Sequence, residues 1–208
     1  MEPSLDDLVE RAGVIADRPG RALLGIVGAP GAGKSTVAAA LTERLRTEGR
    51  VVARVPMDGF HLPQAVLVDR GLRDVMGRID TFDADAYLGL LRRLRDEPDT
   101  SVTAPDFDRV GEEPVADAIT VGPDVGLVVT EGNYLLDADG PWPAVRATLD
   151  AVWFVELDDD ARLERLLRRH VEFGKTEAEA REWVERVDEP NARHIWARRD
   201  LSDLVVAP

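Results

Sequence analysis

Two hydrophobic patterns alternate along the chain. Short, mostly apolar runs predict buried β-strands at 22–27, 51–55, 127–130, 151–157 and 204–206. Segments in which apolar residues recur every three or four positions predict helices at 4–17, 37–45, 84–95, 161–171 and 177–187. Strands that alternate with helices predict a mostly parallel sheet with helices on both faces, which is a three-layer α/β/α fold.

Several helix borders carry their own signals. Gly49 is expected to end the helix at 37–45, and Asp83 is expected to cap the helix at 84–95. Thr176 and Glu179 have the spacing of a capping box that opens the helix at 177–187. Residues 97–123 are rich in proline, glycine and acidic residues, and they predict short strand-like pieces at most.

The chain length of 208 residues suits one domain, expected to span residues 1–208. Within it we expect an N-terminal helix in residues 1–20, packed against an edge of the sheet with Leu5, Leu8, Ala12 and Ile15 inward.

The segment at positions 28–35 reads Gly-Ala-Pro-Gly-Ala-Gly-Lys-Ser and fits the pattern G-x-x-x-x-G-K-[ST]. Its glycines allow backbone N–H groups to point toward an anion, and the helix that follows adds its positive dipole end. We expect Lys34 to reach the β- and γ-phosphates of ATP or GTP and the Ser35 hydroxyl to hold Mg²⁺. The strand before the loop and the helix after it favour this reading over an ordinary glycine-rich turn. The expected nucleotide contacts are Gly28, Ala29, Pro30, Gly31, Ala32, Gly33, Lys34, Ser35 and Thr36.

Two further predicted strands end in acidic residues. Asp58 follows the strand at 51–55, and Glu131 follows the strand at 127–130. Because ligands bind at the carboxyl ends of parallel strands, we expect both carboxylates near the phosphate loop. Asp58 would accept the proton of an acceptor hydroxyl, and Glu131 would hold Mg²⁺ or its water. The alternatives are an ordinary Asp-Gly turn and an exposed glutamate at a strand end.

The predicted helix at 161–171 carries Arg162, Arg165 and Arg169 on one face, at a spacing that could clamp a γ-phosphate. The alternative is a solvated polar face, which is common on surface helices. The link at 172–176 could act as the hinge of a small helical lid formed by residues of about 160–190.

The charge and the composition of the chain limit the classes of partner that we expect. The net charge of −14 argues against a nucleic-acid partner. The absence of cysteine excludes disulfides and thiolate chemistry. No apolar run approaches the roughly 20 residues that cross a bilayer, so no membrane partner is expected. The acidic N-terminus lacks the features of a signal peptide, and we expect a cytoplasmic location. Of the three histidines, we expect His170 to pack or cap and His194 to lie at the surface.

Three further segments are informative through their residue identities and not only through the spacing of their residues. They read Pro-Met-Asp-Gly-Phe-His at 56–61, Thr-Ala-Pro-Asp-Phe-Asp at 103–108 and Thr-Glu-Gly-Asn-Tyr-Leu-Leu at 130–136. Together with the phosphate loop, they resemble the motifs of the phosphoribulokinase, uridine kinase and bacterial pantothenate kinase family, in the branch labelled nucleoside/nucleotide kinase-like or fructose-transport-system-kinase-like. The resemblance runs from about Leu23 to the end of the chain.

The resemblance implies a P-loop kinase fold that uses ATP and Mg²⁺. It implies that Asp58 is the general base or a ligand of the substrate hydroxyl, that Glu131 is an acid on the metal side, and that Arg165 and Arg169 belong to a lid. Implied acceptor contacts are Asp58, Phe60, His61, Asp106, Phe107, Arg109, Glu131 and Asn133. The chain departs from the family at 75–83, which lacks a basic lysine, and at 106–108, which lacks a tyrosine. Both departures fall on the acceptor side and leave the acceptor open.

Motifs and resemblance together predict an ATP-dependent kinase that phosphorylates a hydroxyl of a nucleoside, a sugar or a pantothenate-like acceptor. The expected partner is this small molecule, and a homodimer is an open option. The competing hypothesis is a regulatory nucleotide-binding ATPase, or switch, that has no small-molecule acceptor. The two hypotheses differ in whether an acceptor stimulates ADP release.

Overall fold

The computed structural model of the chain describes residues 3–208 and contains a five-stranded parallel sheet with the order β2-β5-β1-β6-β7. The central strands β1 and β5 are buried along their whole length, as their continuous apolar runs predict. The strands are β1 (Ala22–Gly28), β2 (Val52–Pro56), β5 (Leu127–Gly132), β6 (Ala151–Val155) and β7 (Leu204–Val206).

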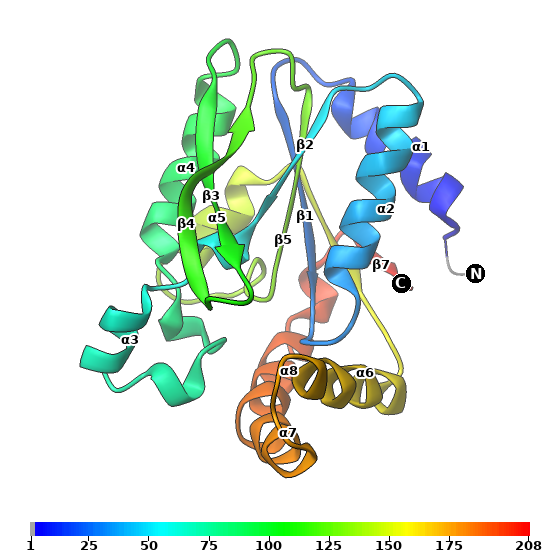
Figure 1. Cartoon of the computed structure of the whole chain (residues 1–208). Coiled ribbons are helices and arrows are strands. Elements are labelled where there is room, and N and C mark those ends of the chain that lie inside the picture. Colours follow the sequence, from blue (N-terminus) through cyan, green and yellow to red (C-terminus); the bar gives the residue numbers. More distant parts are fainter. Residues whose placement is uncertain (1–2) are drawn as a thin grey trace.

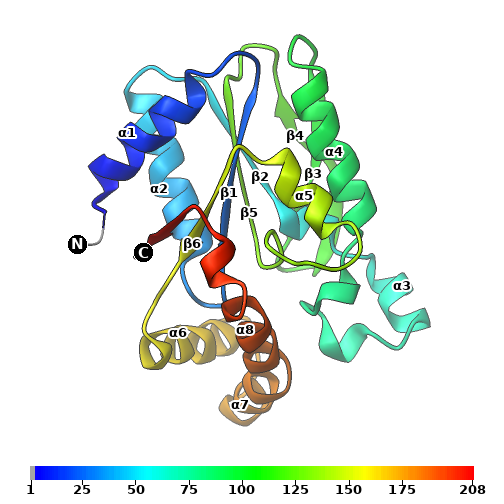
Figure 2. The same cartoon turned by 180° about the vertical axis from the view of Figure 1, so that it is seen from behind.

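Helices cover both faces of the sheet, which gives the predicted three layers (Figures 1 and 2). On one face lie α1 (Leu5–Ala16) and α2 (Lys34–Thr47), and on the other lie α4 (Ala84–Asp96) and α5 (Trp142–Thr148). Successive side chains of β1 point to opposite faces of the sheet. Leu24 and Ile26 pack with α1 and α2, whereas Leu23 and Val27 pack with α4 and α5. The core is therefore split in two by the sheet.

Three helices follow β6 and lie beyond one end of the sheet, beneath the phosphate loop in Figure 1. They are α6 (Asp159–Glu172), α7 (Glu177–Trp183) and α8 (Glu189–Trp196). A π-helical turn, Val184–Asp188, joins α7 to α8. The predicted capping box is present, because Thr176 and Glu179 exchange both hydrogen bonds at the start of α7. These helices occupy the stretch for which the sequence predicts a small helical lid, and we refer to them as the lid.

The segment between β2 and α4 is built of short helical turns. It contains α3 (Gln64–Asp69) and the 3₁₀ turns Met57–Phe60, Arg73–Val75 and Ile79–Thr81. A fourth 3₁₀ turn, Arg199–Leu201, precedes β7. Among the helices of residues 3–208, none combines the length and the apolar character that a membrane crossing requires.

The prediction for residues 97–123 was wrong. This segment forms an antiparallel hairpin of β3 (Val102–Asp108) and β4 (Glu113–Val121), with an irregular register between Ala104 and Asp106. Most of β4 is exposed, so it lacks the apolar alternation that a sequence reading needs. The short helix α5 was not predicted, because its Pro-rich start hides the helical spacing.

The N-terminal helix also differs from its prediction. It packs across α2 and the middle of the sheet instead of against an edge, and Val9 takes the inward position that was assigned to Leu5. Leu5, in the first turn of the helix, is 42% exposed. Residues 1 and 2, part of the predicted 1–20 segment, lie outside the described residues.

A buried arginine ties the hairpin to the sheet at the end remote from the phosphate loop. Arg21 is only 2% exposed, and within residues 3–208 its hydrogen-bond acceptors are all backbone carbonyls. The accepting carbonyls belong to Leu94, Glu97, Pro98, Thr100, Gly122 and Val125. Arg21 thereby fixes the entry and the exit of the hairpin, and the opposite end of β3 is held against the candidate site.

Candidate active site

The phosphate loop lies between β1 and α2, as the motif predicts. Gly31 and Gly33 have φ angles of 80° and 97°, which favour glycine, and Gly33 is the residue before the first turn of α2. Gly28 needs its small size as well, because a Cβ there would lie 2.7 Å from the carbonyl oxygen of Val155. Lys34 folds back over the loop, and its Nζ donates to the carbonyl oxygen of Ala29 at 3.2 Å.

Glu131 is a buried carboxylate beside this loop. It is 3% exposed, and its Oε1 accepts a hydrogen bond of 2.7 Å from the Ser35 hydroxyl. Burial raises the pKa of Glu131, and the neighbouring Asp58 raises it further. Burial lowers the pKa of the Lys34 ammonium, and the Glu131 carboxylate opposes that shift. The site therefore favours extra positive charge next to Glu131, as a bound cation would supply.

Asp58 stands opposite Glu131, at the end of β2. It belongs to the turn Met57–Phe60, and Arg109 donates from Nη2 to its Oδ2 at 3.2 Å. Arg109 comes from the far end of β3, so this ion pair links the hairpin to the sheet.

The glycine after each acid explains how the two carboxylates come close. A Cβ at Gly132 would lie 2.6 Å from the Met57 side chain, so this glycine lets the turn that carries Asp58 pack against β5. A Cβ at Gly59 would overlap the carbonyl of Pro105, so this glycine lets β3 approach the same turn. The Asp-Gly and Glu-Gly pairs are thus positions of close packing rather than simple turn residues.

The arginine face of α6 lies against the phosphate loop. Arg162 is 1% exposed and donates to the carbonyl oxygen of Pro30 at 3.4 Å and to Glu189 Oε1 at 2.5 Å. Arg165 approaches the loop at Gly33, and Arg169 lines the cleft in front of Lys34. The predicted apolar stripe is correspondingly reduced, since only Leu166 is buried and Val171 is 42% exposed.

One cleft with a volume of about 230 Å³ runs between the loop, the hairpin and the lid. Ten residues that the sequence selected line it: Pro30, Lys34, Ser35, Asp58, His61, Phe107, Arg109, Glu131, Asn133 and Arg169. Phe60 does not line the cleft; it lies in the core, with its ring centroid 5.1 Å from that of Tyr87. Asp106 is exposed, and its carboxylate accepts from the backbone N–H of Phe107.

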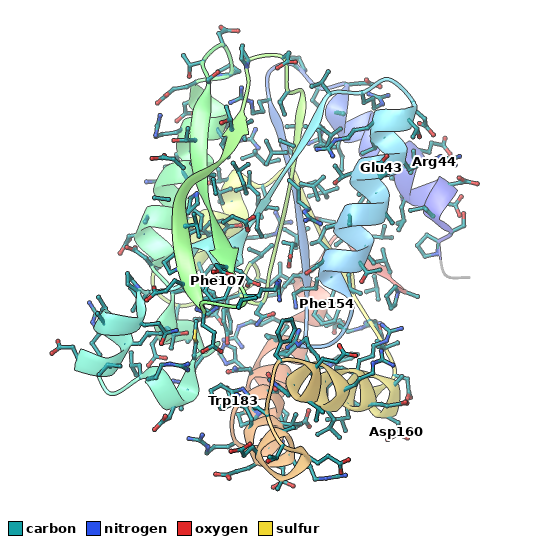
Figure 3. The ribbon with its side chains drawn as sticks, in the orientation of Figure 1. Glu43, Arg44, Phe107, Phe154, Asp160 and Trp183 are labelled. Carbon is teal, nitrogen blue, oxygen red and sulfur yellow. The ribbon has the colours of Figure 1, made fainter. Side chains whose placement is uncertain are left out.

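An aromatic wall closes the side of the cleft that the hairpin forms. The His61 ring stacks on Phe82 with centroids 3.9 Å apart, and Phe107 lies 5.0 Å from His61. Burial lowers the pKa of His61, so the ring is neutral at pH 7. Across the cleft, Lys175 lies over the ring of Trp183 at 4.6 Å. Figure 3 shows Phe107 at the end of the hairpin and Trp183 on the lid below it.

Several lining residues were not found from the sequence. Arg73 forms an ion pair with Glu112. His170, which was expected to pack or cap, instead bonds to the Asp188 side chain at 2.7 Å. Asn191 lines the cleft and donates to the carbonyl oxygen of Gly77, which also accepts from Tyr134 in the core. These partners are 18 to 114 residues apart in the sequence, so no local spacing could have indicated them. His194 is only partly exposed, because it bonds to the buried Asp137.

Comparison with known proteins agrees with this geometry. The family model "Methylmalonyl Co-A mutase-associated GTPase MeaB" matches residues 6–66, the part that holds the phosphate loop and Asp58. The Schizosaccharomyces pombe protein named "Putative uridine kinase C227.14" is 34% identical, over 98% of this chain and 90% of its own length.

Solved structures show the same relationship. A crystal structure titled as a "putative fructose transport system kinase" from Silicibacter sp. TM1040 has a TM-score of 0.90 and 34% identity, over 98% of both chains. Phosphoribulokinase from Rhodobacter spheroides shares the fold, with a TM-score of 0.61 and 14% identity over 90% of this chain and 70% of its own. Fold, site and relatives define a P-loop kinase, which is a class of nucleotide-binding enzyme. The chain belongs to the phosphoribulokinase, uridine kinase and bacterial pantothenate kinase family.

Proposed function

We propose that the protein transfers the γ-phosphate of ATP to a hydroxyl group of a small molecule, such as a nucleoside, a sugar or a pantothenate-like alcohol. The observation that carries this proposal is that Lys34, Asp58 and Glu131 line one cleft. A cleft that joins a phosphate loop to an independent carboxylate provides both a donor position and a base for an acceptor.

On the donor side, the loop from Gly28 to Thr36 would hold the phosphates of ATP through its backbone N–H groups. Lys34 would leave the Ala29 carbonyl and move to the β- and γ-phosphates. Arg165 and Arg169 extend from α6 toward the same region and would stabilise the charge that develops on the transferred group.

The residues beside the loop fit Mg²⁺. Ser35 and Glu131 offer a hydroxyl and a buried carboxylate that are already hydrogen-bonded to each other, and hard cations prefer such oxygen ligands. Among residues 3–208, no group of three or more acidic or histidine side chains forms a metal site. Ser35 and Glu131 would therefore share the ion with the phosphate oxygens of ATP. When bound, Mg²⁺ neutralises part of the phosphate charge.

On the acceptor side, Asp58 would receive the proton of the acceptor hydroxyl. The acceptor oxygen forms a bond to the γ-phosphorus, and the bond from that phosphorus to the β–γ bridging oxygen breaks, so that ADP leaves. His61, Phe107 and Asn133 line the same part of the cleft and would position the acceptor. Positioning would supply much of the rate, because the base takes the proton late in transfer.

A coupled assay of ADP release tests this proposal with nucleosides, pentoses, hexoses, pantothenate and other alcohols as acceptors. We expect at least one acceptor to raise the rate well above the rate with ATP alone. A slow rate that no acceptor changes would instead support the regulatory ATPase and would contradict a kinase for small molecules.

A further inference from the structure

Arg109 and Asp58 form an ion pair that the proposed reaction must disturb. Arg109 Nη2 lies 3.2 Å from Asp58 Oδ2, and the two side chains are 48% and 29% exposed. Asp58 is also the proposed base, so an acceptor hydroxyl has to compete for the same carboxylate. When Asp58 takes the proton of that hydroxyl, it loses its charge and Arg109 loses its partner. Arg109 stays charged because the guanidinium does not deprotonate in proteins.

Resting on the proposed function, we infer that the acceptor carries an anionic group, a carboxylate or a phosphate, near its reactive hydroxyl, and that Arg109 binds this group. The hydroxyl would take the place of Arg109 at Asp58, and the anionic group would replace Asp58 as the partner of Arg109. A guanidinium suits this exchange because its planar set of donors can hold a carboxylate or a phosphate through two parallel hydrogen bonds.

The charges of the cleft agree with an anionic ligand on this side. Five cationic side chains and four carboxylates line the cleft, in a chain whose net charge is −14. The Glu112 carboxylate pairs with Arg73, and Asp188 pairs with His170. Lys175 also lines the cleft, and its ammonium lies over the ring of Trp183. Lys175 is therefore a second cation that an acceptor anion can reach from the lid.

The hairpin gives Arg109 its position for this role. Arg109 follows directly after β3, and the close approach at Gly59 holds this strand against the turn that carries Asp58. The guanidinium and the carboxylate therefore come from two different elements and meet at the acceptor side of the cleft. An uncharged nucleoside could instead lie against Phe107, but it would leave Arg109 without a partner.

Matched acceptors test the inference. Each pair has one anionic and one neutral member: glycerate and glycerol, pantothenate and panthenol, ribose 5-phosphate and ribose. We expect the anionic member of at least one pair to have a kcat/KM about 100-fold higher than its neutral partner, in line with one charge-assisted bidentate contact. The pairs with a carboxylate and the pair with a phosphate separate the two chemical sources.

Variants then identify the residue. Arg109→Met is expected to raise KM for the preferred anionic acceptor about 10- to 100-fold and to remove its advantage over the neutral partner, while Arg109→Lys keeps part of it. Arg92→Met, an exposed arginine of α4, serves as the matched control and should leave the ratio unchanged. Equal turnover of neutral and anionic acceptors, or an Arg109→Met enzyme that keeps the preference, would overturn the inference. Turnover that no acceptor stimulates would instead refute the proposed function itself.

Discussion

Asp58 is the single side chain on which the proposed chemistry depends most. Replacing it with Asn keeps its size and its place beside Arg109 but removes a strong proton acceptor. We expect Asp58→Asn to lower acceptor-dependent turnover about 100- to 10,000-fold, the usual contribution of a general base. ATP binding, followed by isothermal titration, should stay close to that of the wild type, because the phosphate loop is intact.

The control for this variant is Asp96→Asn, at the exposed end of α4. It removes the same charge from the chain without touching the cleft, so its turnover should match that of the wild type. If Asp58→Asn also kept full acceptor-dependent turnover, Asp58 would not be the base.

Glu131 links the candidate site to the stability of the protein. Burial raises the pKa of this carboxyl above its ordinary value of 4.5. The folded state therefore keeps a proton that the unfolded chain has released, and the stability falls as the pH rises through the interval above 4.5. The loss persists at higher pH, where both states are ionised and the folded state holds a buried charge.

Glu131→Gln should remove this pH dependence. Without nucleotide at neutral pH, we expect the Tm to rise by about 2–4 °C, which corresponds to roughly 1 kcal/mol in a chain of this length. In the presence of ATP, added Mg²⁺ should no longer raise the Tm of the Glu131→Gln variant. Thermal unfolding from pH 4 to pH 8, with and without Mg·ATP, measures both effects. Parallel curves for the two proteins across this range would show that Glu131 carries no burial penalty.

At the scale of elements, α6 is the part of the lid that touches the phosphate loop. A Cβ at Gly31 would lie 2.7 Å from Leu166, and Arg162 reaches under the loop to Pro30 and to Glu189 of α8. A sequence reading groups Arg162 with Arg165 and Arg169, but only the structure shows that Arg162 is buried and has its own partners. Its position makes it a structural connection between loop and lid.

We expect Arg162→Ala to lower the free energy of unfolding by about 2–4 kcal/mol, because it removes a buried ion pair and leaves Glu189 without its partner. Arg168→Ala is the matched control in the same helix; its pair with Glu172 is exposed, at 3.8 Å, and should contribute less than about 0.5 kcal/mol. Chemical denaturation of both variants provides the comparison. Similar losses in the two variants would contradict the assigned role of Arg162.

The sheet and most helices could be predicted because they bury regular apolar patterns. β1, β5 and α4 coincide with such patterns to within a few residues. The hairpin β3–β4 could not be predicted, because one of its strands is mostly exposed and its place depends on contacts with distant residues. Asp58 and Glu131 could be selected because parallel strands end at one edge, whereas pairs such as His170 with Asp188 join separate helices.

Across the molecule as a whole, the two ends of the cleft are proposed to bind different substrates, ATP at one end and the acceptor at the other. In the proposed reaction, the loop and α6 would surround the ATP phosphates, and the hairpin with the turns after β2 would surround the acceptor. The chain as a whole carries a net charge of −14, whereas the positive and negative side chains that line the cleft nearly balance. This contrast in charge favours binding of a small charged ligand in the cleft over binding elsewhere on the protein. Both sides are needed for transfer, and neither the loop nor the carboxylate would be sufficient alone.

The most direct test is the stoichiometry of transfer. With an acceptor that stimulates ADP release, phosphorus NMR should detect one phosphorylated acceptor for each ADP formed. Asp58→Asn, measured at the same ATP occupancy, should form almost none. ADP that accumulates together with inorganic phosphate, at a rate that no acceptor changes, would contradict a kinase that phosphorylates a small alcohol.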